Sequence, residues 1–367
     1  MTDLAVALQL RQTRARERMR ELGVDALLLS VGADLPYLTG YEAMPLERLT
    51  MLVVPREGGA TLVVPELEAP RVELVGDAFA LAPWGETADP VREVAALVER
   101  SARTVAIGDQ TWARFVLALQ EALPETSFVD GRSVMAPLRV RKDAAEVKAL
   151  RAAALAVDAV VAEMRERPFG GRREIDVHRE LVDRMLEHGH QRANFAIVGS
   201  GPNGASPHHD ASDRVIASGD LVVCDFGGAM RGYCSDITRV FAVDAVPTDA
   251  AEAYEVLRAA QSDAVAAAKV GTPCEDVDAA ARSVIDAAGY GERFIHRTGH
   301  GIGLDAHEDP YIVAGNEAVL EEGHAFSVEP GIYCPGRWGM RLEDIVVATA
   351  NGPDVLNTAP RDLAIVA

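Results

Sequence analysis

The sequence has few cysteines, and their spacing excludes two common roles of this residue. The 367 residues contain only Cys224, Cys234, Cys274 and Cys334, which form no CxxC pair and are too few to staple a chain of this length. We therefore expect neither a disulfide framework nor a thiolate zinc site. The four thiols are interpreted as reduced and mostly buried.

Long hydrophobic runs and clusters of positive charge are also missing. No stretch approaches the roughly 18 uninterrupted apolar residues of a membrane span, and residues 1–20 mix charged with apolar side chains, unlike a signal peptide. A cytoplasmic protein that spans no membrane is therefore expected. The formal net charge of -20 makes nucleic acid a poor partner.

The composition and length that remain are those of a globular protein with two domains. Half of the residues are hydrophobic (49%) and a quarter are charged (25%), and a domain usually holds about 150 residues. Residues 7–22 have helical spacing and precede short apolar strands, and helices are predicted near 90–101 and 112–122. We predict an α/β domain over residues 1–135, ending in the turn-like stretch DGRSVMAPLRVRKD.

The order of elements changes in the second predicted domain, residues 136–367. Asp143 is a plausible N-cap for a helix that reaches about Arg167, and a second long helix follows it. Strands are then predicted over about 195–244, helices over 248–289 and strands again from 294. This order predicts an α+β domain in which helices cover an antiparallel sheet.

Two aspartates stand at unusual places in this domain. Asp225 and Asp236 lie on the two arms of a predicted hairpin, GDLVVCDFGGAMRGYCSDITRVFAV. Either aspartate alone is ordinarily a turn or exposed strand residue. A buried carboxylate without a partner would instead take up a proton, and two that face each other would repel. A cation between them would resolve both problems.

Histidines and glutamates of the second half add to this pattern. His300 and His307 flank the glycines of HRTGHGIGLDAHEDP, which lacks the lysine of a phosphate loop. Glu329 and Glu343 each lie on or beside an apolar strand. Four acids and one imidazole suit divalent manganese, cobalt, iron or zinc, and five such ligands suit two ions. The remaining histidines considered are interpreted as surface or hydrogen-bonded core residues: His178, His188, His190, His296 and His324.

The sequence resembles the metallopeptidases with the pita-bread fold, which include prolidases, Xaa-Pro aminopeptidases and methionine aminopeptidases. The resemblance covers nearly the whole chain and rests on VCDFGGAMRGYCSDITRVF, GHGIG, SVEPGIY and RLED. The segments RMRELGVDALLLS and DLPYLTGY resemble the creatinase-type N-terminal domain of the proline-specific branch, which methionine aminopeptidases generally lack. The metal ligands that the resemblance implies are Asp225, Asp236, His300, Glu329 and Glu343.

The resemblance implies cleavage of the bond before proline, in peptides with proline in second position. Two divalent ions, manganese first among them, would share a hydroxide that attacks the scissile carbonyl. Glu329 would carry the proton to the leaving nitrogen, and His208 and His307 would donate hydrogen bonds to the substrate carbonyl and the oxyanion. A homodimer is expected from the resemblance alone.

The preference between dipeptides and longer peptides depends on a cation for the carboxylate of proline. Some prolidases place an arginine four residues after the second histidine, where this sequence has Tyr311. Arg48, in MPLERLT, is the alternative that we favour, since the small domain of this family reaches over the active site. Arg297, Arg337 and Arg341 are weaker candidates.

A dipeptidase is therefore predicted, and an Xaa-Pro aminopeptidase that acts on longer peptides is the alternative. Two other classes share the fold, a non-catalytic relative that binds peptides or histones and a creatinase-like amidinohydrolase. Both would be expected to lack some of the metal ligands, and all five residue types are present here.

Overall fold

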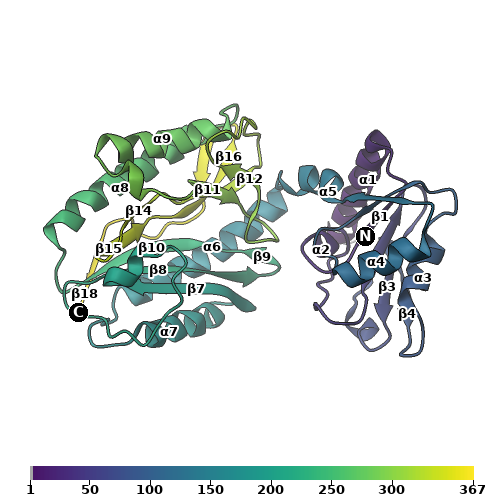
Figure 1. Cartoon of the computed structure of the whole chain (residues 1–367), viewed down its shortest axis with the longest axis horizontal. Coiled ribbons are helices and arrows are strands. Elements are labelled where there is room, and N and C mark those ends of the chain that lie inside the picture. Colours follow the sequence, from purple (N-terminus) through teal and green to yellow (C-terminus); the bar gives the residue numbers. More distant parts are fainter. Residues whose placement is uncertain (1–2) are drawn as a thin grey trace. The chain divides into compact units, whose positions relative to one another are not determined.

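The computed structural model describes residues 3–367 and divides the chain into two units, Met1–Arg139 and Val140–Ala367. In the first unit, the strands described before residue 140 form one sheet in the order β4-β3-β2-β1-β5-β6 (Figure 1). Strand β1 pairs antiparallel with β2 and parallel with β5, so the sheet is mixed. All residues of β1 are buried, as expected for a central strand with both faces covered. The α/β class predicted for this region is confirmed. Its helices and strands are α1 (Asp3–Leu22), β1 (Ala26–Leu29), α2 (Asp34–Thr39), β2 (Met51–Pro55), β3 (Ala60–Pro65), β4 (Phe79–Trp84), α3 (Pro90–Leu97), β5 (Thr104–Ile107), α4 (Ala113–Ala122), β6 (Ser127–Asp130) and α5 (Arg132–Arg139).

Helix α5 corrects the turn predicted for this stretch. The helix contains Pro137, which has no N–H to donate to the carbonyl of Ser133. That carbonyl accepts a hydrogen bond from Arg18 Nε of α1 at 3.3 Å instead. Val134 and Met135 are buried on the inner face of the helix. A tertiary hydrogen bond thus satisfies the Ser133 carbonyl, which has no helical donor because of Pro137. Composition alone could not show that the helix is stabilised in this way.

The second unit is α+β, as predicted. Its strands form two larger sheets, in the orders β18-β10-β8-β7 (with β9 on β8) and β12-β11-β13-β16-β17, together with the hairpin β14-β15. Figure 1 shows α8 and α9 on one side of these strands and α6 and α7 on the other. Apart from the parallel pair β10 and β18, the pairings described in this unit are antiparallel. The elements are α6 (Ala144–Met164), α7 (Glu174–Glu187), β7 (Arg192–Ser200), β8 (Leu221–Met230), β9 (Tyr233–Cys234), β10 (Ile237–Val243), α8 (Thr248–Ala267), α9 (Cys274–Ala287), β11 (Gly299–Gly301), β12 (Glu308–Ile312), β13 (Ala325–Val328), β14 (Gly331–Cys334), β15 (Trp338–Arg341), β16 (Asp344–Thr349), β17 (Gly352–Val355) and β18 (Ala364–Val366).

The N-cap predicted at the start of α6 is confirmed. Asp143 Oδ1 accepts from the backbone N–H groups of Ala145 and Glu146 at 2.8 and 2.9 Å, and the Glu146 carboxylate accepts from Asp143 N. This reciprocal pair is a capping box. The helix ends at Met164, a few residues before the predicted end, because Pro168 follows and disfavours helical backbone before it.

Side-chain alternation along β8 decides which way the first aspartate points. Leu221 and Val223 pack into the core under α8 and α9, whereas Val222 and Cys224 pack against α6 and α7. Because successive side chains of a strand point to opposite faces, Asp225 shares the face of Leu221 and Val223. The same face packs against residues of β12–β16, the part of the chain next to His300, Glu329 and Glu343.

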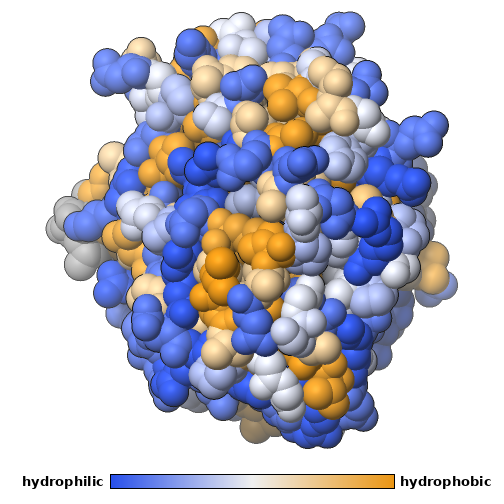
Figure 2. All heavy atoms as spheres, turned by 90° about the vertical axis from the view of Figure 1, so that its left-hand side faces the viewer, coloured by the Kyte–Doolittle hydropathy of each residue, from blue (hydrophilic) through white to orange (hydrophobic). Residues whose placement is uncertain are grey.

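The surface shown in Figure 2 is mostly hydrophilic, with apolar residues gathered in patches between the charged ones. Scattered apolar patches of this kind are ordinary on folded proteins. Among residues 3–367, no helix combines the length and the apolar character needed to cross a membrane.

Candidate metal centre

The predicted acids and the glycine-flanked histidine come together inside the second unit. Asp225 lies on β8, Asp236 just before β10, His300 on β11, Glu329 just after β13 and Glu343 just before β16. In each of two overlapping groups, Asp225–Asp236–Glu343 and His300–Glu329–Glu343, the oxygen and nitrogen atoms that could bind a metal lie within 4.8 Å of one another. We call these five residues the acid cluster.

Two carboxylate oxygens of the acid cluster test whether a metal would fit. Asp225 Oδ1 and Asp236 Oδ1 are buried and accept no hydrogen bond from any residue that the structure describes. Buried oxygens without a donor are costly in a folded protein. Four carboxylates, two of which have such an unpartnered oxygen, are the donor set that a divalent cation prefers. The residues therefore fit a metal site.

The histidine of the acid cluster also fits a metal site. His300 Nδ1 faces the carbonyl oxygen of Gly301 at 3.1 Å, so Nδ1 carries the proton and donates it. The other ring nitrogen, Nε2, lies 3.2 Å from Glu329 Oε1 and 3.8 Å from Asp236 Oδ2. In the neutral ring this nitrogen has a lone pair that a cation held by the same carboxylates would bind. Without a cation, a proton on Nε2 would let the ring donate to Glu329 instead.

The pKa values of the four acids show how they influence one another. Burial raises the pKa of Asp225 and, helped by the negative charges around them, raises the pKa values of Asp236 and Glu343 well above the usual range. Burial also opposes ionisation of Glu329, but the hydrogen bond and charge of His300 outweigh it and lower that pKa to about 2. Without a cation the cluster therefore resists full ionisation.

Arg341 belongs to this centre and is not free for a substrate. Its buried guanidinium pairs with Asp225 Oδ2 and donates to the Tyr333 hydroxyl at 2.7 Å and to Thr238 Oγ1 at 3.1 Å. The Thr238 hydroxyl donates in turn to Glu343 Oε2 at 2.7 Å. Arg341 Nε also lies 3.9 Å from Glu329 Oε2. Arg341, a weaker candidate for the substrate carboxylate, is thus linked to three members of the acid cluster instead.

A cavity of about 720 Å³ opens onto the acid cluster. His208 and His307, both predicted to contact the substrate, line it together with apolar side chains such as Phe195 and Ile295. The rings of His300 and His307 lie 3.8 Å apart, and burial together with the neighbouring His300 lowers the pKa of His307 to about 4. His307 is therefore neutral at neutral pH and has one N–H to donate.

His296 is a site residue that the sequence interpretation missed. It was taken for a surface or core histidine, yet it lines the cavity. Its Nδ1 donates to the carbonyl of Arg297 at 2.7 Å, and its Nε2 lies 2.9 Å from the Tyr333 hydroxyl. Since Arg341 donates to that hydroxyl, the tyrosine donates to His296, and a hydrogen-bonded chain runs from the cavity wall to Asp225. One signal in the sequence could have indicated this role, because His296 stands only four residues before the predicted ligand His300.

Two of the other four histidines show the expected structural contacts most clearly. His178 Nδ1 donates to Ala196 O at 2.6 Å. His190 is buried between Met185 O at 3.1 Å and Ser235 Oγ at 2.8 Å. His188 pairs with Glu163, and His324 Nδ1 accepts from a backbone N–H.

The arginines considered for the substrate carboxylate differ in their surroundings. Arg297 lines the cavity, with its guanidinium carbon 4.4 Å from the centre of the Tyr311 ring, and it pairs with no carboxylate of the described chain. Arg337 pairs with Asp249. Arg48 lies in the first unit, where it pairs with Glu47 and Glu86.

Comparison with known proteins identifies the family. Residues 147–350 match the model of metallopeptidase family M24, and residues 11–141 match the creatinase/prolidase N-terminal domain. The chain belongs to metallopeptidase family M24. It is a metallopeptidase with the pita-bread fold that its ligand motifs predicted.

Similar proteins extend over almost the entire chain. A probable dipeptidase PepE of Mycobacterium tuberculosis is 43% identical in an alignment of 350 positions, which covers 94% of this chain and 93% of the relative. An Xaa-Pro dipeptidase of Lactobacillus helveticus is 34% identical in an alignment of 369 positions, which covers 96% of this chain and 98% of the relative. A solved prolidase from Thermococcus sibiricus is 36% identical, with a TM-score of 0.90 over 97% of this chain and 98% of that chain.

Proposed function

We propose that this metallopeptidase hydrolyses the bond before proline, preferentially in Xaa-Pro dipeptides. The observation that carries the proposal is one cavity that holds the acid cluster, the imidazoles of His208 and His307, and the guanidinium of Arg297. The Lactobacillus and Thermococcus relatives support the proline specificity, because their names state it.

The acid cluster would hold two divalent metal ions. Manganese is our first choice, and cobalt, zinc or iron also suit four carboxylates and one imidazole. When bound, such ions polarise a scissile carbonyl and lower the pKa of the attacking water.

Glu329 is the residue that we assign to proton transfer. The Ser327 hydroxyl donates to its Oε1 at 2.9 Å, which orients the side chain toward the cavity. The lowered pKa of Glu329 keeps this carboxylate ionised, which is the form that can accept a proton. The nitrogen of proline leaves as an amine, so the same carboxylate can then deliver the proton that it needs.

His208 and His307 would bind the substrate carbonyl and the charge that develops on its oxygen. Both line the cavity beside the acid cluster. His307 is neutral above its pKa of about 4, so it donates through its N–H without requiring protonation. A neutral donor also keeps this contact constant across neutral pH.

We propose Arg297 as the cation that receives the carboxylate of a dipeptide, with Arg48 as the second candidate. Arg297 lies in the cavity and has no acidic partner in residues 3–367, whereas Arg48 pairs with Glu47 through Nη1 and with Glu86 through Nε. Tyr311, at the position where some prolidases have arginine, stacks against Arg297 and holds its guanidinium. The two residues together could thus supply what an arginine at position 311 would supply alone.

The test is a comparison of three peptides on the manganese-loaded enzyme. We expect Leu-Pro to be cleaved faster than Leu-Pro-Ala, and Leu-Ala to be cleaved far more slowly than either. A preference for the tripeptide would favour the alternative of an Xaa-Pro aminopeptidase. Equal rates for Leu-Ala and Leu-Pro would contradict the proline specificity.

We also propose that residues 1–135 and 136–367 are separate domains and that the chain forms a homodimer. Limited proteolysis between the two ranges tests the first statement. The mass in solution, measured by light scattering, tests the second.

A further inference from the structure

Glu174, the first residue of α7, is a fully buried carboxylate outside the acid cluster. The donors that bind it come from a segment far along the chain. Its Oε1 accepts from the backbone N–H and hydroxyl of Ser200 at 2.8 and 2.7 Å. Its Oε2 accepts from the backbone N–H and hydroxyl of Ser212 at 3.1 and 2.6 Å. One carboxylate thus links Ser200, at the end of β7, to Ser212, twelve residues later in the chain.

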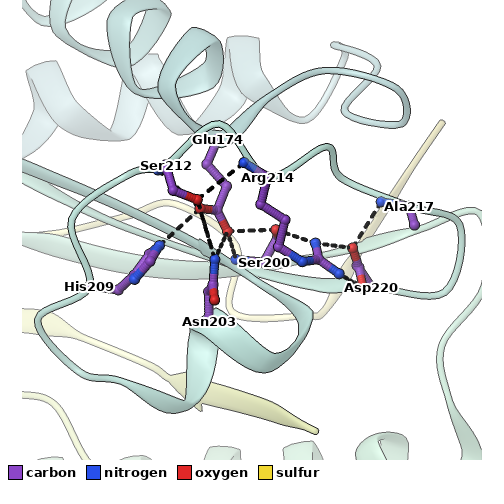
Figure 3. Close-up of polar contacts among 8 residues, drawn as sticks. All are labelled: Glu174, Ser200, Asn203, His209, Ser212, Arg214, Ala217 and Asp220. Carbon is purple, nitrogen blue, oxygen red and sulfur yellow. Dashed lines mark hydrogen bonds and ion pairs between the residues drawn. The ribbon is translucent and has the colours of Figure 1, made fainter. Parts of the chain in front are cut away.

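The segment between those two serines is bound to the same carboxylate at two further points. Asn203 Nδ2 donates to both oxygens of Glu174 at 3.1 Å, and His209 Nε2 donates to Oε2 at 2.9 Å. Figure 3 shows these side chains converging on Glu174. We call residues 201–211 the histidine loop.

His208 lies inside the stretch that these contacts close. Two backbone hydrogen bonds, Ser206 N to Asn203 O at 3.0 Å and His209 N to Ser206 O at 3.2 Å, fold the loop into consecutive turns. The neighbours His208 and His209 have different surroundings, since His208 lines the cavity while His209 binds Glu174. The backbone at His208 is therefore held by the contact of its neighbour His209 with Glu174.

Arg214 completes the arrangement without neutralising Glu174 directly. Its guanidinium donates to Ser200 Oγ at 2.6 Å and pairs with Asp220 at 2.6 Å, as Figure 3 shows. The Ser200 hydroxyl thus accepts from the Arg214 guanidinium, and the Ser212 hydroxyl accepts from the Arg214 backbone N–H. Both hydroxyls donate to the carboxylate of Glu174. A carboxylate that accepts from this many donors is strongly oriented.

We propose that Glu174 is a positioning residue, which holds the histidine loop so that His208 faces the substrate. The proposal rests on the proposed function, because His208 is assigned there to the substrate carbonyl. Among the described residues, Glu174 accepts hydrogen bonds from Ser200, Asn203, His209 and Ser212, none of which belongs to the acid cluster. Its loss should therefore leave metal binding intact and act through His208.

The test is a double-mutant cycle on the metal-loaded enzyme, with Leu-Pro as the substrate. Glu174→Gln replaces one acceptor oxygen by an NH2 group, which then faces the donors that this oxygen had bound. The hydrogen bonds on that side of the side chain are lost, and the histidine loop is released there. We expect kcat/KM to fall about 10- to 100-fold, because a small displacement of a positioning group has effects of this size. In the His208→Ala background the same substitution should change kcat/KM less than about 2-fold. Equal losses in the two backgrounds would overturn the proposal.

Two further variants keep the test decisive. Glu180→Gln, on the same helix, removes a carboxylate that pairs with Arg172 and Arg184, and it should leave kcat/KM unchanged. If Glu174→Gln fails to fold, Ser212→Ala removes a single hydroxyl donor and keeps the carboxylate. We expect it to lower kcat/KM about 2- to 10-fold, and only when His208 is present. A loss that persists in His208→Ala would contradict the proposal.

Hydrogen exchange separates this proposal from the proposed function. Amides of residues 200–212 should exchange faster in Glu174→Gln than in the unsubstituted chain, whatever peptide the enzyme cleaves. Unchanged exchange would show that Glu174 does not hold the loop. Failure of the unsubstituted enzyme to cleave Leu-Pro would refute the proposed function alone.

Discussion

The acid cluster and the side chains that we assign to substrate binding share one cavity but are held in different ways. Most of the acid cluster is buried, and its members lie on strands or directly beside them. His208, His307 and Arg297, which we call the cavity rim, are exposed or half-buried and depend on hydrogen-bonded loops and ring contacts. The acid cluster stands on paired strands, whereas the rim stands on loops that side-chain contacts hold in place. Loops tolerate changes of side chain better than paired strands do, so we expect substrate choice to be set at the rim.

The largest expected effect is the loss of an acid-cluster residue. Asp236→Asn removes a charged ligand, so we expect activity on Leu-Pro to fall to the background rate and the metal content per chain to drop. Elemental analysis after dialysis, together with a peptidase assay, checks both results. Full metal content in an inactive variant would contradict the assignment of Asp236 as a ligand.

Glu329→Gln should separate metal binding from proton transfer. The amide can still offer an oxygen but cannot accept the proton, so kcat should fall about 10²- to 10⁴-fold with metal still bound. The control is the metal content of the same preparation. Near-full activity with metal bound would make the proton-transfer role wrong.

The stability of the rim should depend on pH through Glu174. Its pKa lies at about 2, because the hydrogen bonds from Ser200 and Ser212 outweigh the burial that opposes ionisation. The pKa is lower than in the unfolded chain, so the stabilisation is complete above about pH 4.5 and is lost as the pH falls toward 2. We expect unfolding by urea to show a loss of about 3 kcal/mol over this range. Glu174→Gln should lack that part of the pH dependence, and identical curves would contradict the assignment.

The five residues that the structure brings together in the acid cluster could be singled out in the sequence for a physical reason. An aspartate within an apolar strand, as at Asp225, is anomalous unless something binds it, and such anomalies can be seen without a structure. Glu174 could not be recognised in this way, because an acid in the first turn of a helix is ordinary. Its partners lie 26 to 38 residues away and become neighbours only in the fold.

The other differences have similar causes. His296 was interpreted as structural, because a single histidine shows no sign of which cavity it lines. Helix α5 was predicted as a turn, because the contact from Arg18 that compensates for Pro137 is tertiary. The α/β and α+β classes and the N-cap at Asp143 were predicted correctly, because hydrophobic periodicity and capping are local properties.

Arg297→Ala should change substrate choice more than it changes chemistry. A hydrogen-bonded ion pair with a carboxylate contributes about 1.5–3 kcal/mol, so kcat/KM for Leu-Pro should fall about 10- to 150-fold. The amide Leu-Pro-NH2, which has no such carboxylate, should be affected less than about 3-fold. Arg48→Ala is the matched variant. If Arg48→Ala alone reproduces this selective loss, the carboxylate is bound by Arg48 and not by Arg297.

The smallest expected effect tests how the rim holds its arginine. Tyr311→Leu keeps an apolar side chain under Arg297 but removes the aromatic face, whose interaction with a guanidinium contributes about 0.5–1 kcal/mol at an exposed site. We expect kcat/KM for Leu-Pro to fall only about 2- to 5-fold, and Leu-Pro-NH2 to be unaffected. The effect should vanish in the Arg297→Ala background, because the ring then has no cation to hold. A loss that is equal for both peptides would instead mean that Tyr311 contacts the substrate directly, and Tyr311 would then belong to the cavity rim itself.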